Sequence, residues 1–299
     1  MSAYGKLFSY PMSKTDHAPI HRAGSPRGFS LIELLVTIGI IVTLAVVGTG
    51  IQGTMAEKAA TAQDVAAGKT LISAYQAYAA ENGGQLLVGY QKSAQPVTLP
   101  DGSQISGEAA SRYVWRLAPY FDYSINGVLY SKARARAQKE SEDAGMKGYG
   151  ESISVAYGIN AYYVGGFVEN GETSIPSGDV ATSLLQVDKP SSLLVFATAR
   201  SSQGSGHYLV KAPRFVPRAA GSGSLSQPDW PQNGSSESTG NVDFRNGDKA
   251  LCVFLDGSIR PYAVAELTDM RLWSKNAARD DNPNYAPVLE GGSGGRGNR

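Results

Sequence analysis

The sequence contains very few of the side chains on which most catalytic and metal sites depend. Among 299 residues there is one cysteine, Cys252, and there are three histidines, His17, His21 and His207. A single cysteine excludes an internal disulfide and a zinc site built from cysteines. No nucleophile motif such as G-x-S-x-G lies beside His207, and no P-loop or dinucleotide fingerprint is present. We therefore predict no catalytic residue, no cofactor and no metal ion, and thus a protein that is not an enzyme.

The chain also lacks an excess of charge of one sign. It has 27 Lys and Arg against 26 Asp and Glu, for a formal net charge of +1. A protein that binds nucleic acid through a broad surface needs a clear basic excess. The basic residues of segment 132–147 are followed at once by acidic ones, which is typical of a solvated face. We predict no nucleic acid partner.

What the sequence does have is one long apolar run near its beginning. Residues 29–51 read FSLIELLVTIGIIVTLAVVGTGI, and Glu33 is the one charged residue among them. A helix rises about 1.5 Å per residue, so this run is long enough to cross a hydrocarbon core of about 30 Å. The preceding residues 1–28 carry four basic residues and one acidic residue, which favours a cytoplasmic N-terminus. These features predict a single-pass protein of the inner (cytoplasmic) membrane, with its remaining part periplasmic or extracellular.

The residues around the start of this run form an ordered motif, Arg27-Gly28-Phe29-Ser30-Leu31-Ile32-Glu33-Leu34-Leu35-Val36. The motif resembles the class III signal of type IV pilins and type II secretion pseudopilins. The resemblance implies that a prepilin peptidase cuts between Gly28 and Phe29 and methylates the new amino group of Phe29. It also implies an assembly platform and an ATPase as partners, together with other pilin or pseudopilin subunits in a homo- or hetero-filament.

Glu33 is the residue we expect to guide assembly. An ionised carboxylate in an apolar phase is costly unless it has a partner of opposite charge. The amine of Phe29 on a neighbouring subunit can supply that charge, and the contact then sets the register between subunits. The competing interpretation is that Glu33 stays protonated and unpaired near the membrane interface.

Downstream of residue 54 the pattern changes twice. Segment 55–82 is rich in Ala, Lys, Glu and Gln, and its apolar residues Val65, Ile72, Tyr75 and Ala79 recur at helical spacing. Asn82-Gly83-Gly84 is a helix-stop signal. After it come short segments typical of strands, at 153–159, 162–168, 192–199 and 208–211, and a hairpin at 250–264 with Asp256-Gly257 as a type I′ turn.

Together these patterns predict an α+β fold in which a long N-terminal transmembrane α-helix packs on a small antiparallel β-sheet head, as in pilins. The predicted segments are listed in chain order: 1–28 leader peptide, 29–54 transmembrane and filament-core helix, 55–83 extracytoplasmic continuation of the helix, 84–276 globular head with a long surface loop at 219–241, and 277–299 disordered tail.

The head has a second, more scattered resemblance, to long pseudopilin-like proteins. It rests on segments 157–160, 190–196 and 254–258, and Asn246 stands where those proteins often carry a histidine. Two clusters rich in Asp and Asn, at 243–248 and 280–282, leave open a calcium site of the kind found in the loops of major pseudopilins. They are equally typical of ordinary turns.

We therefore expect a pilin-like or pseudopilin structural subunit of a type II secretion pseudopilus or a type IV pilus-like filament. The alternative is a permanently membrane-anchored extracytoplasmic ligand-binding module.

Overall fold

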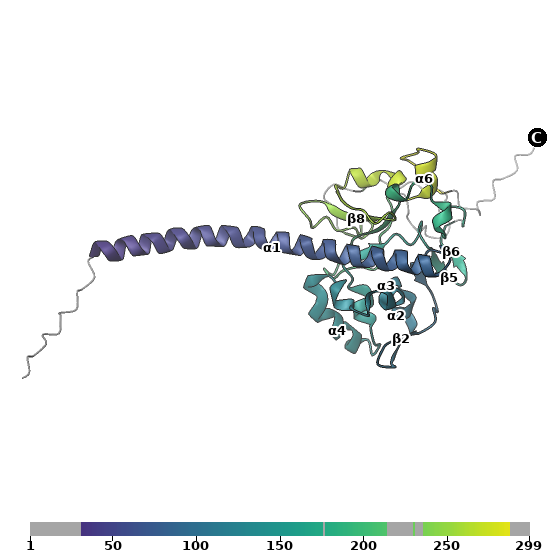
Figure 1. Cartoon of the computed structure of the whole chain (residues 1–299), viewed down its shortest axis with the longest axis horizontal. Coiled ribbons are helices and arrows are strands. Elements are labelled where there is room, and N and C mark those ends of the chain that lie inside the picture. The colour runs from purple at the N-terminus through teal and green to yellow at the C-terminus, as the bar shows by residue number, and fades with distance from the viewer. Residues whose placement is uncertain (1–30, 176, 214–229, 231–235, 288–299) are drawn as a thin grey trace, which may run out of the picture. The chain divides into compact units, whose positions relative to one another are not determined.

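The computed structural model describes residues 31–175, 177–213, 230 and 236–287. Residue contacts divide the chain into two compact units, Met1–Gly53 and Thr54–Arg299. Every sheet of the described residues lies in the second unit (Figure 1).

The first element is the helix α1, Leu31–Glu81. It ends where the sequence predicts: Gly83 and Gly84 follow with φ angles of 63° and 82°, a left-handed conformation that glycine adopts without strain. The Gly84 amide donates to the carbonyl of Ala79 over 2.7 Å and so satisfies one of the free carbonyls of the last turn. The predicted stop at Asn82-Gly83-Gly84 is confirmed.

Within the second unit, α1 buries one stripe against the head. Ile72, Tyr75 and Ala79 of the predicted stripe are buried, and Val65 is half-buried against the same core. Leu71 completes the stripe and is fully buried. The helical spacing of these residues places them on one face, which explains why this part of the helix is fixed to the head.

The predicted transmembrane helix is wrong. Among the residues that the structure describes, no helix combines the length and the apolar character needed to cross a bilayer. The part of α1 that lies in the second unit carries the charged residues Glu57, Lys58, Asp64 and Lys69, which an apolar membrane-spanning segment would not. This finding overturns the predicted fold class in its transmembrane, pilin-like part and the predicted single-pass inner-membrane localisation. An α+β class remains.

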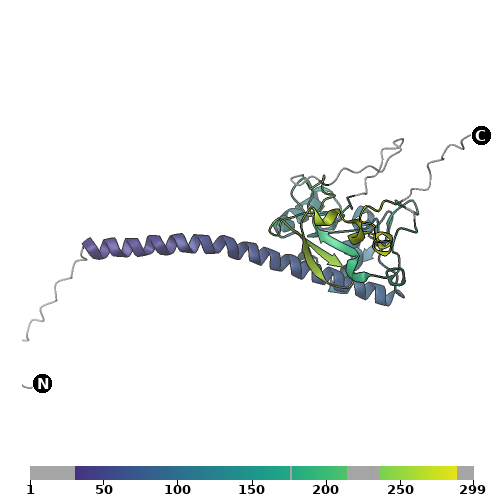
Figure 2. The ribbon, with the colours of Figure 1, turned by 90° about the horizontal axis from the view of Figure 1, so that it is seen from above.

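The largest sheet has four antiparallel strands in the order β4-β7-β8-β9. Their bounds are β4 Tyr157–Ile159, β7 Leu194–Thr198, β8 Ala250–Phe254 and β9 Ile259–Tyr262. Figure 2 shows β7 and its neighbours from the side opposite to α1. The β7–β8 pairing contains an irregularity between Leu194 and Phe196.

The hairpin of β8 and β9 forms where the sequence predicts, but its turn differs. Gly257 has a φ angle of 87°, whereas Asp256 is not in the left-handed region that a type I′ turn requires at both central residues. The amide of Gly257 bonds to the carbonyl of Phe254, and that of Phe254 bonds to the carbonyl of Ser258. The connection is therefore a three-residue loop closed by a left-handed glycine.

The remaining strands form two smaller sheets. One of them contains a parallel pair, so the prediction of a purely antiparallel head is wrong. The strand β1, Tyr90–Gln91, pairs in parallel with β5, Phe167–Glu169, which pairs in antiparallel with β6, Glu172–Thr173. The strands β2, Val97–Thr98, and β3, Gln104–Ile105, form a separate antiparallel pair. The predicted strand at 208–211 appears as a single parallel bridge between Ile159 and Leu209.

Short helices fill the remaining connections. The α-helices are α2 Gly107–Ser111, α3 Tyr113–Leu117, α4 Arg134–Asp143, α5 Tyr149–Ile153 and α6 Lys275–Arg279. The 3-10 helices are η1 Ala118–Phe121, η2 Ile125–Gly127, η3 Ser131–Ala133, η4 Leu184–Gln186, η5 Pro190–Ser192, η6 Glu266–Thr268 and η7 Met270–Leu272.

Two predicted irregular segments meet the described structure only in part. The boundary predicted for the tail at residue 277 falls inside α6, where Ala277 and Ala278 are buried. Residues 288–299 lie outside the described residues, as do 219–229 and 231–235 of the predicted loop.

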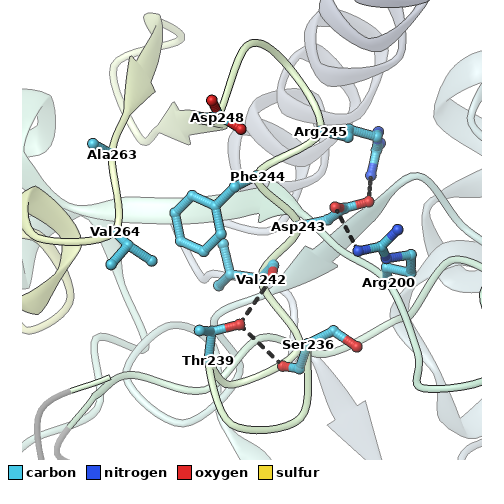
Figure 3. Close-up of a pocket in the computed structure, with 10 residues that line it drawn as sticks. All are labelled: Arg200, Ser236, Thr239, Val242, Asp243, Phe244, Arg245, Asp248, Ala263 and Val264. Atoms are coloured by element: carbon cyan, nitrogen blue, oxygen red, sulfur yellow. Dashed lines mark hydrogen bonds and ion pairs between the residues drawn. The ribbon is translucent and has the colours of Figure 1, made fainter. Parts of the chain in front are cut away.

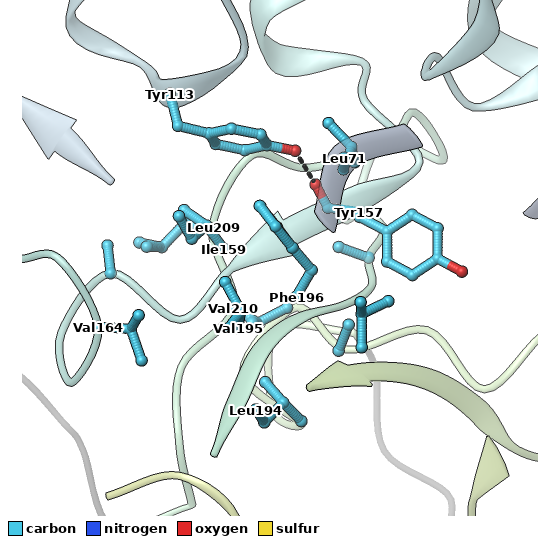
Figure 4. Close-up of a cluster of buried hydrophobic side chains, with 14 of the residues drawn as sticks. Leu71, Tyr113, Tyr157, Ile159, Val164, Leu194, Val195, Phe196, Leu209 and Val210 are labelled. Atoms are coloured by element: carbon cyan, nitrogen blue, oxygen red, sulfur yellow. Dashed lines mark hydrogen bonds between the residues drawn. The ribbon is translucent and has the colours of Figure 1, made fainter. Parts of the chain in front are cut away.

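The core lies between α1 and the four-stranded sheet (Figure 4). Tyr75 of α1 meets Phe196 of β7 edge-to-face, with ring centroids 5.6 Å apart. Tyr113 of α3 also packs against the ring of Phe196, with ring centroids 5.3 Å apart. Its hydroxyl donates to the carbonyl of Tyr157 over 2.7 Å. Aromatic rings that are fully buried and paired in this way fix the helix on the sheet.

Candidate functional site

The residues that the sequence assigns to processing and assembly are not brought together by the described structure. Gly28 and Phe29 lie outside the described residues. The backbone of Glu33 lies in α1, but its side chain is likewise outside the description. Their predicted roles therefore stay predictions.

Among the described side chains of the head, the guanidinium of Arg245 makes the most polar contacts. It forms a two-point ion pair with Asp64 of α1, with Nε 2.7 Å from Oδ2 and Nη2 3.0 Å from Oδ1. Its Nη1 lies 2.9 Å from Oδ2 of Asp243. Nη2 also donates to the carbonyl of Ala156, and the guanidinium carbon lies 4.7 Å from the ring centroid of Tyr130. We call Asp64, Asp243 and Arg245 the Arg245 cluster.

Burial makes the Arg245 cluster energetically important. The side chains of Arg245, Asp64 and Asp243 are 13%, 10% and 2% exposed. Burial alone would lower the pKa of the Arg245 guanidinium, but the hydrogen bonds and charges of Asp64 and Asp243 raise it above its usual value. A buried charge that loses its partner is left uncompensated in a medium of low dielectric constant. The ion pairs of the cluster therefore stabilise the contact between α1 and the segment that leads into β8.

A cavity of about 590 Å³ opens beside the Arg245 cluster (Figure 3). It is lined by Arg200, Ser236, Thr239, Val242, Asp243, Phe244, Arg245, Asp248, Ala263 and Val264. Figure 3 shows the carboxylate of Asp243 between the guanidiniums of Arg200 and Arg245. Nη2 of Arg200 is 3.5 Å from Oδ1 of Asp243, so both oxygens of that carboxylate face arginines. Three of the charged side chains that line the cavity, those of Arg200, Asp243 and Arg245, are thus paired with one another.

In the two clusters that left a calcium site open, three of the carboxylates, those of Asp243, Asp280 and Asp281, are engaged by arginines. Asp243 is held by Arg200 and Arg245 as described, and Asn246 donates to Asp64 over 3.1 Å. In the second cluster, Asp280 pairs with Arg279, and Asp281 pairs with Arg271. Within the described ranges no group of three or more metal-ligating side chains converges on one point.

His207 and Cys252 have surroundings that suit packing. Burial lowers the pKa of His207 and so favours its neutral form, and its Nδ1 lies 2.8 Å from the carbonyl oxygen of Leu209. Cys252 is fully buried inside β8, and burial raises the pKa of its thiol. A nucleophilic cysteine needs the opposite shift, because the thiolate is the reactive form.

Sequence reasoning missed the pairing of Asp64 with Arg245. The two residues are 181 positions apart, so no local spacing connects them. One signal was available: Asp64 lies four residues before Gly68 and seven before Leu71, on the face of α1 that the apolar stripe defines. A carboxylate on a buried helical face requires a cation from elsewhere in the fold.

Comparison with known proteins adds no assignment: no family model, no curated protein and no solved structure matches the chain.

Proposed function

We propose that this chain is a non-enzymatic structural subunit of a pseudopilin-type filament. It is made as a precursor, cut by a prepilin peptidase between Gly28 and Phe29, methylated on Phe29, and assembled with other subunits by a platform protein and an ATPase. The observation that carries the proposal is the ordered motif of residues 27–36, in which a small residue, an aromatic residue and Glu33 stand in the order that this processing requires.

The exposure of α1 near its start supports assembly through that helix. Leu35, Val36 and Ile38 are 69%, 51% and 53% exposed. Burial of apolar surface stabilises an association by about 25 cal/mol per Å². A run of apolar side chains that is open to solvent is therefore a natural contact surface for identical helices of neighbouring subunits.

The Arg245 cluster supports a structural role for the head. Its charges are satisfied by one another, and they tie the part of α1 within the second unit to the sheet. A subunit that bears load along a filament needs a head that does not detach from its helix. Buried ion pairs and aromatic packing across that contact supply such a connection.

The proposal is tested by following the processing of the chain in cells that contain an active prepilin peptidase. Gly28→Val should block cleavage, because a branched side chain replaces the small residue before the cut. Gly24→Val, a change of the same chemistry four residues earlier, is the matched control and should leave cleavage intact. Intact mass measurement of both variants and the wild type gives the processed fraction. Equal processing of Gly28→Val and Gly24→Val, or no cleavage of the wild type, would contradict the proposal.

A further inference from the structure

Arg116, in the last turn of α3, is a cation without a counter-ion in the described part of the head. Its Nη2 donates to the carbonyl oxygens of Ser111 and Gly89 over 3.0 Å and 3.3 Å. Both acceptors are neutral, and Arg116 belongs to none of the ion pairs that the described residues form. The positive charge of this guanidinium is therefore not compensated.

The surroundings of the Arg116 guanidinium are poor in water. Its Nε is buried and has no hydrogen-bond acceptor among the described residues. Burial is the largest influence on this group and lowers the pKa of the guanidinium to about 10. A buried cation without a partner is costly, and such groups in folded proteins are normally paired or bound to an ion.

The Arg245 cluster shows how this chain treats a buried arginine that has its own counter-ions. There the carboxylates of Asp64 and Asp243 raise the pKa of the guanidinium in spite of burial. At Arg116 the shift has the opposite sign, and no carboxylate is among its causes. What distinguishes the two sites is thus an anion, which the first has within the chain and the second lacks.

Two tyrosines of α1 supply further polar groups near Arg116. The hydroxyls of Tyr78 and Tyr75 are the groups that act on its charge, in that order. The hydroxyl of Tyr75 is already used, because it donates to the carbonyl of Leu87 over 3.1 Å. The hydroxyl of Tyr78 forms no hydrogen bond with another described residue. One hydroxyl donor beside the guanidinium is therefore available to a ligand.

The site formed by Arg116 and Tyr78 is ordered and can be reached from solvent. Both residues are half-buried, so part of each side chain faces water. The ring of Tyr78 packs edge-to-face on that of Tyr120, with centroids 5.8 Å apart, which fixes its position. Glu81, three residues after Tyr78, acts on the hydroxyl of Tyr120 and is not among the groups that act on Arg116.

We propose that Arg116 and the hydroxyl of Tyr78 bind a small oxyanion, either inorganic phosphate or the carboxylate of a small acid. Guanidinium groups form their strongest hydrogen bonds with the oxygens of phosphate and carboxylate. The bound oxyanion accepts from the free N–H groups of Arg116 and from the Tyr78 hydroxyl, and it supplies the missing negative charge. The site joins α1 to α3 and goes beyond the proposed function, since it does not depend on cleavage after Gly28.

Equilibrium dialysis of the full chain tests the site. Radiolabelled phosphate and radiolabelled acetate are titrated separately, with sodium chloride keeping the ionic strength constant. One of the two should bind saturably at one equivalent per chain, and the one that binds identifies the source of the oxyanion. Saturable binding of neither anion in the presence of chloride would overturn the proposal.

Variants assign the binding to Arg116. Arg116→Met keeps an unbranched side chain without the charge and should weaken binding about tenfold or more. Tyr78→Phe removes only the hydroxyl and should weaken it less. Arg271→Met is the matched control, because Arg271 already pairs with Asp269 and Asp281, and it should bind as the wild type does. Equal weakening in Arg116→Met and Arg271→Met would overturn the proposal, as would unchanged binding in both Arg116→Met and Tyr78→Phe.

Thermal unfolding with the anion that binds gives a second readout. A ligand that binds the folded chain raises the midpoint of unfolding as its concentration increases. Salts such as phosphate also stabilise folded proteins in general, so the difference between variants is what counts. The rise should be larger for the wild type and Arg271→Met than for Arg116→Met. An equal rise in all three would contradict binding at Arg116.

Discussion

The two parts of α1 place their apolar side chains in opposite surroundings. In the second unit Leu71 and Tyr75 are fully buried, and Asp64 forms an ion pair with Arg245. In the first unit Leu35 and Val36 are more than half exposed. Among the described side chains of α1, burial is thus confined to the second unit, and the apolar ones described in the first unit are exposed. Under the proposed function, identical helices of other subunits cover the exposed apolar side chains of the first unit.

The largest loss of stability should come from removing the positive charge of the Arg245 cluster. Arg245→Met leaves Asp64 and Asp243 buried without a cation, and we expect a loss of about 3–5 kcal/mol in the free energy of unfolding. Denaturant unfolding of the full chain measures this loss. Arg271→Met is the matched control, because Arg271 pairs with Asp269 and Asp281 in a more exposed setting, and its loss should stay below about 1 kcal/mol. Equal losses from the two variants would show that burial of the Arg245 cluster adds nothing.

The next effect should come from truncating the apolar stripe. Leu71→Ala removes a fully buried side chain and should destabilise the chain by about 2–5 kcal/mol. Leu35→Ala removes the same atoms from an exposed position on the same helix and should change the free energy of unfolding by less than about 0.5 kcal/mol. Denaturant unfolding of both variants measures the two changes in free energy. A loss for Leu35→Ala as large as that for Leu71→Ala would contradict it.

A smaller effect is expected from the single hydrogen bond between Tyr157 and α1. The hydroxyl of Tyr157 donates to the carbonyl of Asp64 over 2.9 Å. Tyr157→Phe keeps the ring and should cost about 0.5–1.5 kcal/mol. Tyr123→Phe, which removes a hydroxyl bond at an exposed site, should cost less. Unfolding that is unchanged in Tyr157→Phe would mean that the hydroxyl does not help to hold the helix.

The smallest effect on stability, with a large effect on assembly, is expected for Glu33. Glu33→Ala should leave cleavage and the unfolding of the head unchanged, because the residue lies in the first unit. Filament incorporation should be lost, since the partner that we propose for the Phe29 amine is removed. Glu57→Ala, which removes an exposed carboxylate from α1 in the second unit, should assemble normally. Normal filament yield from Glu33→Ala would exclude the proposed pairing.

Local signals in the sequence predicted local structure well. Asn82-Gly83-Gly84 ends α1 because glycine tolerates the left-handed cap, and Asp256-Gly257 joins β8 to β9. The turn type was wrong, since only Gly257 of that pair takes a positive φ angle. Short-range patterns thus locate a turn more securely than they specify its geometry.

Contacts between residues far apart in the chain could not be predicted from the sequence. The parallel pairing of β1 with β5 joins segments that carry no shared pattern, and the ion pair between Asp64 and Arg245 spans most of the chain. Asp243 was recognised as part of a polar cluster, but its neighbours could not show that two arginines engage it. The transmembrane helix, predicted from the hydropathy of residues 29–51, was wrong. Hydropathy of a run describes its composition and does not describe its surroundings.

The most direct test of the proposed function is the N-terminal mass of this chain in filaments sheared from its host cells. Under the proposed function, the filament fraction contains a chain that begins at Phe29 and carries one added methyl group. A chain that begins at Met1 and does not enter that fraction, in cells whose prepilin peptidase is active, would contradict it.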